Sequence, residues 1–308
     1  TQHIGASFFP LETVIKITGK LYEKLAKSDV SVPGLLVIDT PGHEVFANLR
    51  VRGGSAADIA ILVVDVNKGF EAQTLESIQI LQKRKVPFVV ALNKVDMIAG
   101  WRQAPSVTPG FSLPNDQTNK AAAATPLFIT QQLRTQDIAI QTLLDEKIYN
   151  VVGSLSRLGY NSEAFWRIKE FTKEVAIVPV SASTGIGIPE LLAVLIGLAQ
   201  QYMAKKLERQ KDEIARGIVL EVNEEVGLGP SANFILLEGI IKQGDTIVVA
   251  KRNEAIVTKI KSLLLPKPLD EMRDPRDKFK PVTEVISAAG LKITSPELDG
   301  VLAGSPLY

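Results

Sequence analysis

A single stretch of the sequence decides the fold: Leu35-Leu36-Val37-Ile38-Asp39-Thr40-Pro41-Gly42-His43-Glu44, a short apolar run followed by an acid and a glycine turn. Such a run predicts a strand buried on both faces, and an acid at its end lies at the sheet edge where α/β proteins bind ligands. Gly42 has no Cβ, so its backbone N–H can approach a phosphate closely. The D-x-x-G pattern therefore indicates a site for phosphate and metal, with an ordinary strand-to-helix turn as the alternative.

A second motif, Asn93-Lys94-Val95-Asp96, follows another apolar strand pattern. Because strands that alternate with helices form parallel units, this strand is expected to end at the same sheet edge as Asp39. Asp96 can accept hydrogen bonds from N1–H and the exocyclic amine of guanine, and adenine offers no such pair of donors. The stem of Lys94 can lie along the base, while Asn93 braces the loop and reaches the imidazole edge. The motif favours a guanine site over its alternative, a polar helix cap.

A third motif, Ser181-Ala182-Ser183-Thr184-Gly185, ends a further apolar run. This turn has backbone N–H groups that could meet guanine O6, although by itself it is a common sequence at helix N-termini. Pro189 then suits the first turn of a helix that is expected to run to about residue 210.

The segment Met97–Thr172 lies between the second and third motifs and is longer than a minimal nucleotide-binding domain needs. Its first half, Pro105–Pro126, is rich in Pro, Ser, Asn and Ala and predicts an irregular loop. Its second half, Leu127–Leu158, has the apolar spacing of one long or two shorter amphipathic helices that pack on the flank of the sheet. The pattern does not indicate what this insertion does.

The remaining patterns describe a second, all-β region. Before it, strands are expected at Leu11–Thr18 and Ile59–Val66, and a helix at Thr74–Lys85 whose basic last turn suits the helix dipole. A charged hinge leads to segments with period-2 alternation and glycine turns, which predict a small antiparallel barrel. These segments are residues 218–222, 232–237, 246–250, 255–261 and 291–293. A loop at residues 267–280 mixes basic and acidic side chains, so it is either an RNA-facing loop or a solvated one.

The composition is that of an ordinary soluble globular protein. The chain has 308 residues, enough for about two domains, and a net charge of +1 gives no general signal for nucleic acid or membrane. The absence of cysteine excludes disulfides and thiol chemistry and fits a reducing compartment. No leader pattern and no membrane-length apolar run occur, so a cytoplasmic protein without membrane contact is expected.

Four short segments resemble the guanine-nucleotide motifs of translational GTPases: Thr1–Ala6, Asp39–Glu44, Asn93–Asp96 and Ser181–Ala182. The I-G-A opening and residues 50–53 are similar, more specifically, to archaeal and eukaryotic initiation factor five-B, the counterpart of bacterial initiation factor two. The resemblance implies an α/β, P-loop-NTPase-like G domain with a mostly parallel sheet in residues 1–212, including the insertion at about 97–172. It implies a small antiparallel β-barrel domain in residues 213–308.

The resemblance also implies ribosome-stimulated hydrolysis of GTP during joining of the ribosomal subunits, with GTP or GDP and Mg²⁺ as cofactors. On the phosphate side, the resemblance implies that Thr1 and Asp39 bind Mg²⁺. It also implies that the Gly42 amide contacts the γ-phosphate and that His43 orients the attacking water. The residues implied to bind the nucleotide on the base side are Asn93, Lys94, Asp96, Ser181 and Ala182.

One departure from the family pattern is that G-x-x-x-x-G-K-[ST] occurs nowhere in the chain. That loop cradles the phosphates, so the chain as printed is expected to bind and hydrolyse GTP poorly. In the family the loop precedes the segment that begins at Thr1, and the chain is therefore expected to be a fragment that lacks it. Two alternatives stay open: an elongation-type translational GTPase and a ribosome-binding scaffold that does not hydrolyse GTP.

The resemblance implies the ribosome as the main partner. The second domain would contact small-subunit rRNA, and the region of His43 would contact the GTPase centre of the large subunit. Initiator tRNA and other initiation factors would be bound by further domains, expected beyond Tyr308.

Overall fold

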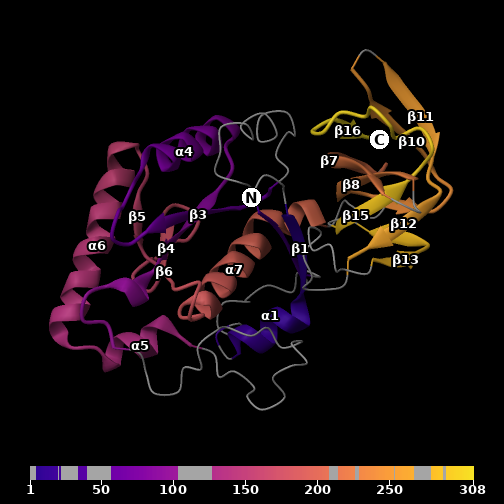
Figure 1. Ribbon diagram of the computed structural model, residues 1–308. Coiled ribbons are helices and arrows are strands. Elements are labelled where there is room, and N and C mark those ends of the chain that lie inside the picture. The colour runs from indigo at the N-terminus through magenta and orange to yellow at the C-terminus, as the bar shows by residue number, and fades with distance from the viewer. Residues whose placement is uncertain are drawn as a thin grey trace. The chain divides into compact units, whose positions relative to one another are not determined.

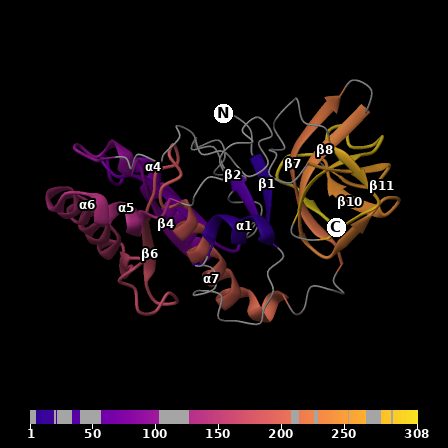
Figure 2. The same ribbon diagram turned by 90° about the horizontal axis from the view of Figure 1, so that it is seen from below.

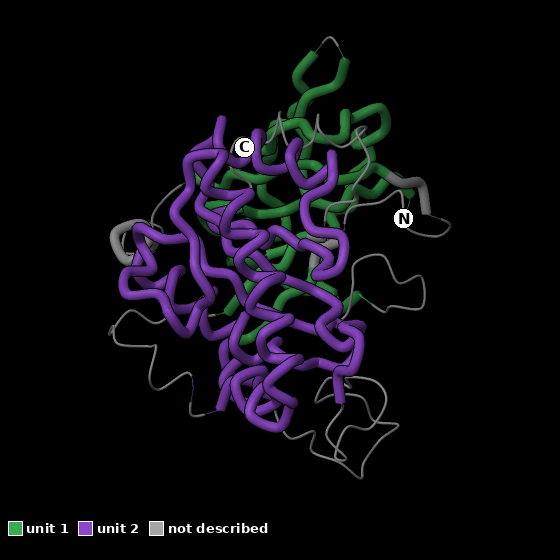
Figure 3. Tube along the Cα trace, turned by 90° about the vertical axis from the view of Figure 1, so that its left-hand side faces the viewer, with its two compact units in different colours: residues 1–10, 33–57, 203–308 green, residues 11–32, 58–202 purple. Residues whose placement is uncertain are grey.

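The computed structural model describes residues 5–19, 21, 34–39, 57–102, 127–207, 214–225, 229–252, 254–266, 279–286 and 289–308. The chain divides into two compact units (Figure 3): unit 1 comprises residues 1–10, 33–57 and 203–308, and unit 2 comprises residues 11–32 and 58–202. Each unit has its own hydrophobic core. The predicted boundary between residues 212 and 213 stays a prediction.

Unit 2 is built on a four-stranded parallel sheet. Its strands, in spatial order, are β3 (Ala60–Asp65), β4 (Phe88–Asn93), β6 (Val175–Pro179) and β5 (Ser162–Ala164). The central strand β4 is buried on both faces, as its continuous apolar run predicts. Strand β3 lies at the edge of this sheet, and Ile61 and Val63 on one of its faces are 37% and 60% exposed. The burial on both faces that a continuous apolar run predicts is therefore observed in β4 but not on one face of β3.

Helices flank this sheet. They are α4 (Ala72–Arg84), α5 (Ile129–Thr135), α6 (Ile138–Arg157) and α7 (Ile188–Leu207), with a 3₁₀ turn, η2 (Val95–Met97), after β4. Ile78 of α4 and Leu144 and Ile148 of α6 pack in one core with Leu92. Helices α6 and α7 lie on opposite sides of the sheet in both views (Figures 1 and 2). The helical half of the insertion thus forms two helices, α5 and α6, and α6 packs on the sheet as predicted.

The segment Leu11–Thr18 is a helix, α1, and not the predicted strand. Its buried residues are Val14, Ile17 and Thr18, whose spacing places them on one helical face. Thr18 Oγ1 donates a hydrogen bond to the Val14 carbonyl oxygen at 2.8 Å, and Gly19 follows with φ +53°. The β-branched residues favoured a strand, but their period of three to four decides for a helix.

The strand that ends in Asp39 does not belong to the parallel sheet of the described residues. It is β2 (Gly34–Asp39), which pairs antiparallel with β1 (Gly5–Pro10) in a two-stranded sheet of unit 1. Residues 34–38 are half-buried, so the expected burial on both faces is also wrong here. A single antiparallel partner leaves the strand less covered than a central parallel strand.

The rest of unit 1 is a curved, eight-stranded antiparallel sheet, and the predicted fold class is confirmed (Figure 1). In spatial order its strands are β11 (Ala255–Lys259), β10 (Thr246–Ala250), β16 (Pro306–Leu307), β7 (Arg216–Glu225), β8 (Gly229–Glu238), β15 (Ala289–Thr294), β12 (Ser262–Leu265) and β13 (Lys280–Val282). A separate pair is formed by β9 (Ile240–Lys242) and β14 (Glu284–Ile286). Phe234, Leu236 and Ile293 lie in the core of unit 1. The strands that the sequence missed in this sheet and this pair, β9, β12, β13, β14 and β16, have two to four residues, too few for a visible alternation.

Two expectations lie outside the described residues: the loop at 105–126, and the loop at 267–280 apart from its last two residues. Among the helices that the structure does describe, none is long and apolar enough to cross a membrane.

Candidate functional site

Three loops meet at the carboxyl edge of the parallel sheet in unit 2. The first follows β3 (residues 66–71), the second follows β4 (residues 94–97) and the third follows β6 (residues 181–187). Asp65 at the end of β3 lies in register with Asn93 at the end of β4, and Leu92 lies in register with Pro179 at the end of β6. Since the strands are parallel, the loops that follow them emerge at one edge, which is where α/β proteins bind ligands. The structure therefore brings the second and third sequence motifs together.

Asn93 joins these two motifs directly. Its Oδ1 accepts hydrogen bonds from the backbone N–H of Lys94 at 2.8 Å and from that of Ala182 at 3.0 Å. The backbone adds a third link, because the N–H of Val95 donates to the carbonyl oxygen of Val180 at 3.2 Å. The sequence predicts that Asn93 braces the loop, and these two hydrogen bonds form such a brace.

Asp96 presents an unused acceptor. Its Oδ2 accepts a hydrogen bond from Ser183 Oγ at 3.2 Å, whereas its Oδ1 is buried and has no hydrogen-bond partner among the described residues. Ser183 is itself held by the hydroxyl of Ser181 at 3.0 Å. A buried carboxylate oxygen without a donor is costly, and a ligand with N–H groups would satisfy it. The side chain is therefore oriented and ready to accept from a donor edge such as that of guanine.

The third motif offers fewer free donors than the sequence suggests. The N–H of Ser181 donates to the carbonyl oxygen of Ile186 at 2.8 Å, and the N–H of Ala182 donates to Asn93 Oδ1. Each group has one proton to give. A base that used the Ala182 N–H would have to replace Asn93 as its acceptor.

Lys94 is held by an acid that the sequence analysis missed. Its Nζ lies 2.8 Å from Asp65 Oδ2, and its backbone is left-handed with φ +70°. The hydrogen bond from Lys94 lowers the pKa of Asp65, against the opposing effect of burial, and the same bond raises the pKa of Lys94. Asp65 ends an apolar run as Asp39 does, so the same rule applied to β3 would have identified it.

Asp65 also builds the turn after β3. Its Oδ1 accepts hydrogen bonds from the N–H groups of Asn67 at 2.8 Å and Lys68 at 3.3 Å. The side-chain amide of Asn67 donates to the carbonyl oxygen of Met97 at 3.4 Å, beyond the second motif. This turn thus ties the loop after β3 to the loop after β4.

The contacts within unit 2 do not test the four phosphate-side residues. Thr1, Gly42 and His43 lie outside the described residues, and Asp39 ends β2 in the other compact unit. In the part of the chain that the structure describes, no group of three or more His, Cys, Asp or Glu could hold a metal ion. The Mg²⁺ and catalytic roles of these four residues stay predictions.

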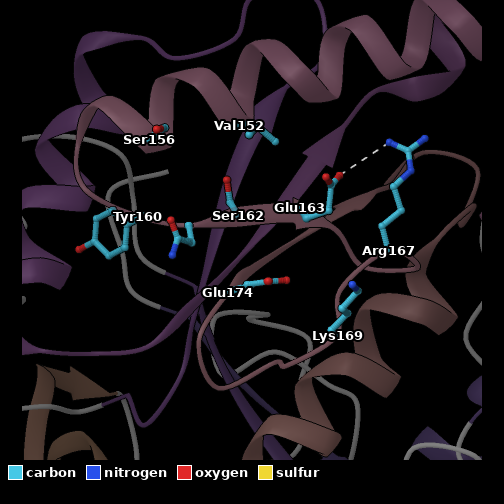
Figure 4. A pocket seen from close by; sticks show the side chains of 9 residues that line it. Val152, Ser156, Tyr160, Ser162, Glu163, Arg167, Lys169 and Glu174 are labelled. Atoms are coloured by element: carbon cyan, nitrogen blue, oxygen red, sulfur yellow. Dashed lines mark ion pairs between the residues drawn. The ribbon is translucent and has the colours of Figure 1, made fainter.

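A cavity of about 350 Å³ lies at the opposite edge of the sheet, around the amino ends of β5 and β6 (Figure 4). It is lined by Val152, Ser156, Tyr160, Asn161, Ser162, Glu163, Arg167, Lys169 and Glu174. Arg167 is already paired, with Asp145 at 2.8 Å and with Glu163 at 3.7 Å. The mixed charge and the location at the amino edge separate this cavity from the three loops.

A family model described as "Elongation factor Tu GTP binding domain" matches residues 15–201. The chain is 48% identical over 307 residues to the "Probable translation initiation factor IF-2" of Thermococcus onnurineus, covering 100% of this chain and 48% of that protein. It is 49% identical over 308 residues to the protein of the same name from Ignicoccus hospitalis, 47% of which it covers. The chain thus spans about half the length of these two curated relatives.

Solved structures agree with these matches. The crystal structure of GDP-bound aIF5B from Aeropyrum pernix has a TM-score of 0.82 and 44% identity, with 100% of this chain and 48% of that chain covered. The match to the crystal structure of a bacterial selenocysteine-specific elongation factor has 20% identity and a TM-score of 0.53. It covers 96% of this chain and 42% of that chain, and it shows the fold alone. Because the family model matches more than half of the chain, the chain belongs to the Elongation factor Tu GTP binding domain family, and its relatives there are the initiation factors named IF-2 and aIF5B.

Proposed function

We propose that the three loops bind the guanine base of GTP and GDP, in a GTPase that acts in translation initiation. The observation that carries the proposal is the buried Oδ1 of Asp96, which lacks a partner among the described residues while Ser183 fixes the other oxygen. Guanine offers N1–H and an exocyclic amine to such a carboxylate, and adenine does not. The likeness to a structure solved with GDP supports the same reading.

Binding of the base requires one rearrangement in the loops. If guanine O6 takes the N–H of Ala182, Asn93 Oδ1 gives up that bond and keeps the one from Lys94. The side-chain amide of Asn93 is then a donor for the imidazole edge of the base. Lys94, positioned by Asp65, supplies an aliphatic stem that covers one face of the base.

The phosphate side is proposed from the family resemblance. Thr1 and Asp39 would hold Mg²⁺, which neutralises charge on the phosphate oxygens when it is bound, and the Gly42 amide would contact the γ-phosphate. His43 would orient the attacking water and stabilise the developing charge, in either protonation state. The expected partner of this reaction is the ribosome in the cytoplasm, with small-subunit RNA at the barrel unit and the GTPase centre of the large subunit near His43. Initiator tRNA and other initiation factors would bind through domains outside this chain.

The test uses the full-length natural protein that contains this chain. Titration with GDP, GTP and ADP is expected to give GDP and GTP affinities at least about 100-fold above that for ADP, because unpaired polar groups reject the analogue that lacks their partners. Equal binding of ADP and GDP would overturn the guanine assignment. GTP binding without hydrolysis on ribosomes would support the scaffold alternative.

A further inference from the structure

The insertion at residues 97–172 has a defined connection to the base-binding loops. The N–H of Gly187, at the end of the third loop, donates to the carbonyl oxygen of Leu127 at 2.9 Å. Three residues further on, Glu190 Oε1 accepts hydrogen bonds from the N–H and from Oγ1 of Thr130, each at 3.3 Å. Leu127 and Thr130 lie at the start of α5, so the insertion contacts the end of the third loop at Gly187 and the first turn of α7 at Glu190.

Glu190 is an unusual residue to find at this junction. Its side chain is 1% exposed, no basic side chain is paired with it in the described structure, and its Oε2 has no hydrogen-bond partner there. Burial raises the pKa of Glu190 to about 7, against hydrogen bonds from Thr130 and from the backbone N–H groups of Glu190 and Ile129, which lower it. Burying a carboxyl in this way costs free energy that an apolar side chain would not. The packing of α7 alone, whose neighbouring residues are apolar, does not call for an acid here.

The loop between Ser181 and Gly187 joins this contact with the insertion to the residues that contact Asn93 and Asp96. Gly187 has φ +76°, and a Cβ on it would collide with the carbonyl oxygen of Pro179, so the backbone has little room to move. Ser181 and Ile186 close the loop with a 2.8 Å hydrogen bond between their backbones. A displacement at Gly187 therefore reaches Ala182 and Ser183, which contact Asn93 and Asp96.

We propose that Glu190 is a positioning residue of the base-binding loop, and that through Glu190 and Thr130 the insertion sets how tightly the site holds a guanine nucleotide. This inference rests on the proposed function and adds a role for the insertion. Loss of the contact leaves the hydrogen bond between Gly187 and Leu127 in place, so the loop at 181–187 is held less firmly against the start of α5. The nucleotide then dissociates faster, while the preference for guanine stays, because Asp96 is unchanged.

The test measures the dissociation rate of a fluorescent GDP from the full-length natural protein. Glu190→Ala removes the acceptor and is expected to speed dissociation by about five- to tenfold, a factor typical of coupling between sites. Glu190→Gln keeps an acceptor for Thr130 and is expected to restore a rate within about twofold of the wild type. Thr130→Val keeps the shape and the N–H but removes Oγ1, so an intermediate rate is expected.

A matched control is Asp145→Asn, which removes an acid from α6 in the same insertion but faces Arg167 and not the third loop. It is expected to leave the dissociation rate unchanged. An unchanged rate in Glu190→Ala, or an equal rise in Asp145→Asn, would overturn the inference while GDP binding by the wild type upheld the proposed function. If Glu190→Ala fails to fold, an unchanged rate in Thr130→Val overturns it. Failure of the wild type to bind GDP would overturn the proposed function itself.

Discussion

Two strands of nearly the same sequence pattern, Gly34–Asp39 and Ala60–Asp65, end in an aspartate and differ in almost every other respect. The first, β2, pairs antiparallel with β1 in unit 1. The second, β3, lies in the parallel sheet of unit 2, and its aspartate forms an ion pair with Lys94. The contrast teaches that an apolar run with a terminal acid predicts a strand and its polar end, whereas the pairing partner decides which site the acid serves.

A third acid, Glu190, extends this contrast and gives the largest expected effect. Its raised pKa means that the folded state holds the proton more tightly, so the contribution of Glu190 to the stability of unit 2 is fully present below about pH 4.5 and is lost as pH rises to about 7. The loss amounts to about 3 kcal/mol, and Glu190→Gln is expected to abolish it. Urea unfolding at a series of pH values, followed by the fluorescence of Trp101 and Trp166 in unit 2, measures this slope.

Asp65 should show the opposite sign. Its pKa is lowered, so its contribution is present at neutral pH and lost as pH falls through the acid range. Asp65→Asn is therefore expected to leave the slope between pH 5 and 7 unchanged. A slope that persists in Glu190→Gln would contradict the buried-carboxyl account.

Asn93→Ala tests the brace between the two motifs. It removes two hydrogen bonds of the proposed complex, the one from the N–H of Lys94 to Asn93 Oδ1 and the one from the Asn93 amide to the imidazole edge of the base, and each lost bond costs about 1 kcal/mol. The affinity for GDP is expected to fall about 30-fold, as measured by equilibrium titration. Asn67→Ala, which removes only a 3.4 Å bond to Met97, serves as the control and should change the affinity less than about threefold.

The edge position of β3 predicts a difference within the parallel sheet. Val90 is fully buried in β4, whereas Val63 is 60% exposed in β3. Val90→Ala is expected to lower the free energy of unfolding by about 2 kcal/mol, and Val63→Ala by less than about 0.5 kcal/mol. Equal losses in denaturant unfolding would mean that this face of β3 is covered in the natural protein.

Asp39 and Asp65 can be distinguished by whether the effect of their substitution on GDP affinity depends on Mg²⁺. This is the smallest of the expected effects. Asp65→Asn releases Lys94 and should weaken GDP binding about three- to fivefold with or without Mg²⁺, as expected for a partly exposed ion pair. Asp39→Asn should weaken it only when Mg²⁺ is present, if the role implied by the resemblance holds. Titrations in Mg²⁺ and in EDTA distinguish the two, and a magnesium-dependent effect of Asp65→Asn would break the comparison.

Much of the arrangement of the loops after β4 and β6 could be predicted from the sequence. Asn93, Asp96 and the turn at Ser181 follow apolar strands, and parallel pairing of those strands was enough to bring them together. The hydrogen bond from the Ala182 N–H to Asn93 Oδ1 was not predictable, because it depends on how two loops pack. The same holds for the contact of Glu190 with Thr130, which are 60 residues apart in the chain.

The errors have physical reasons of the same kind. In Leu11–Thr18 the β-branched composition suggested a strand, but burial follows the helical period of Val14, Ile17 and Thr18. For Asp39, the apolar run correctly predicted a strand, yet the sequence contains no local signal for an antiparallel partner at residues 5–10. Local patterns determine the element, and contacts distant in sequence determine its neighbours.

The most direct test of the central claim is the base specificity of Asp96→Asn in the full-length natural protein. Asparagine can donate a hydrogen bond where aspartate only accepts, so the variant should prefer the carbonyl of xanthine to the exocyclic amine of guanine. The account predicts that the variant binds XDP at least about 10-fold more tightly than GDP, the reverse of the wild type. An unchanged preference for GDP in the variant would contradict the assignment of Asp96 to the guanine base.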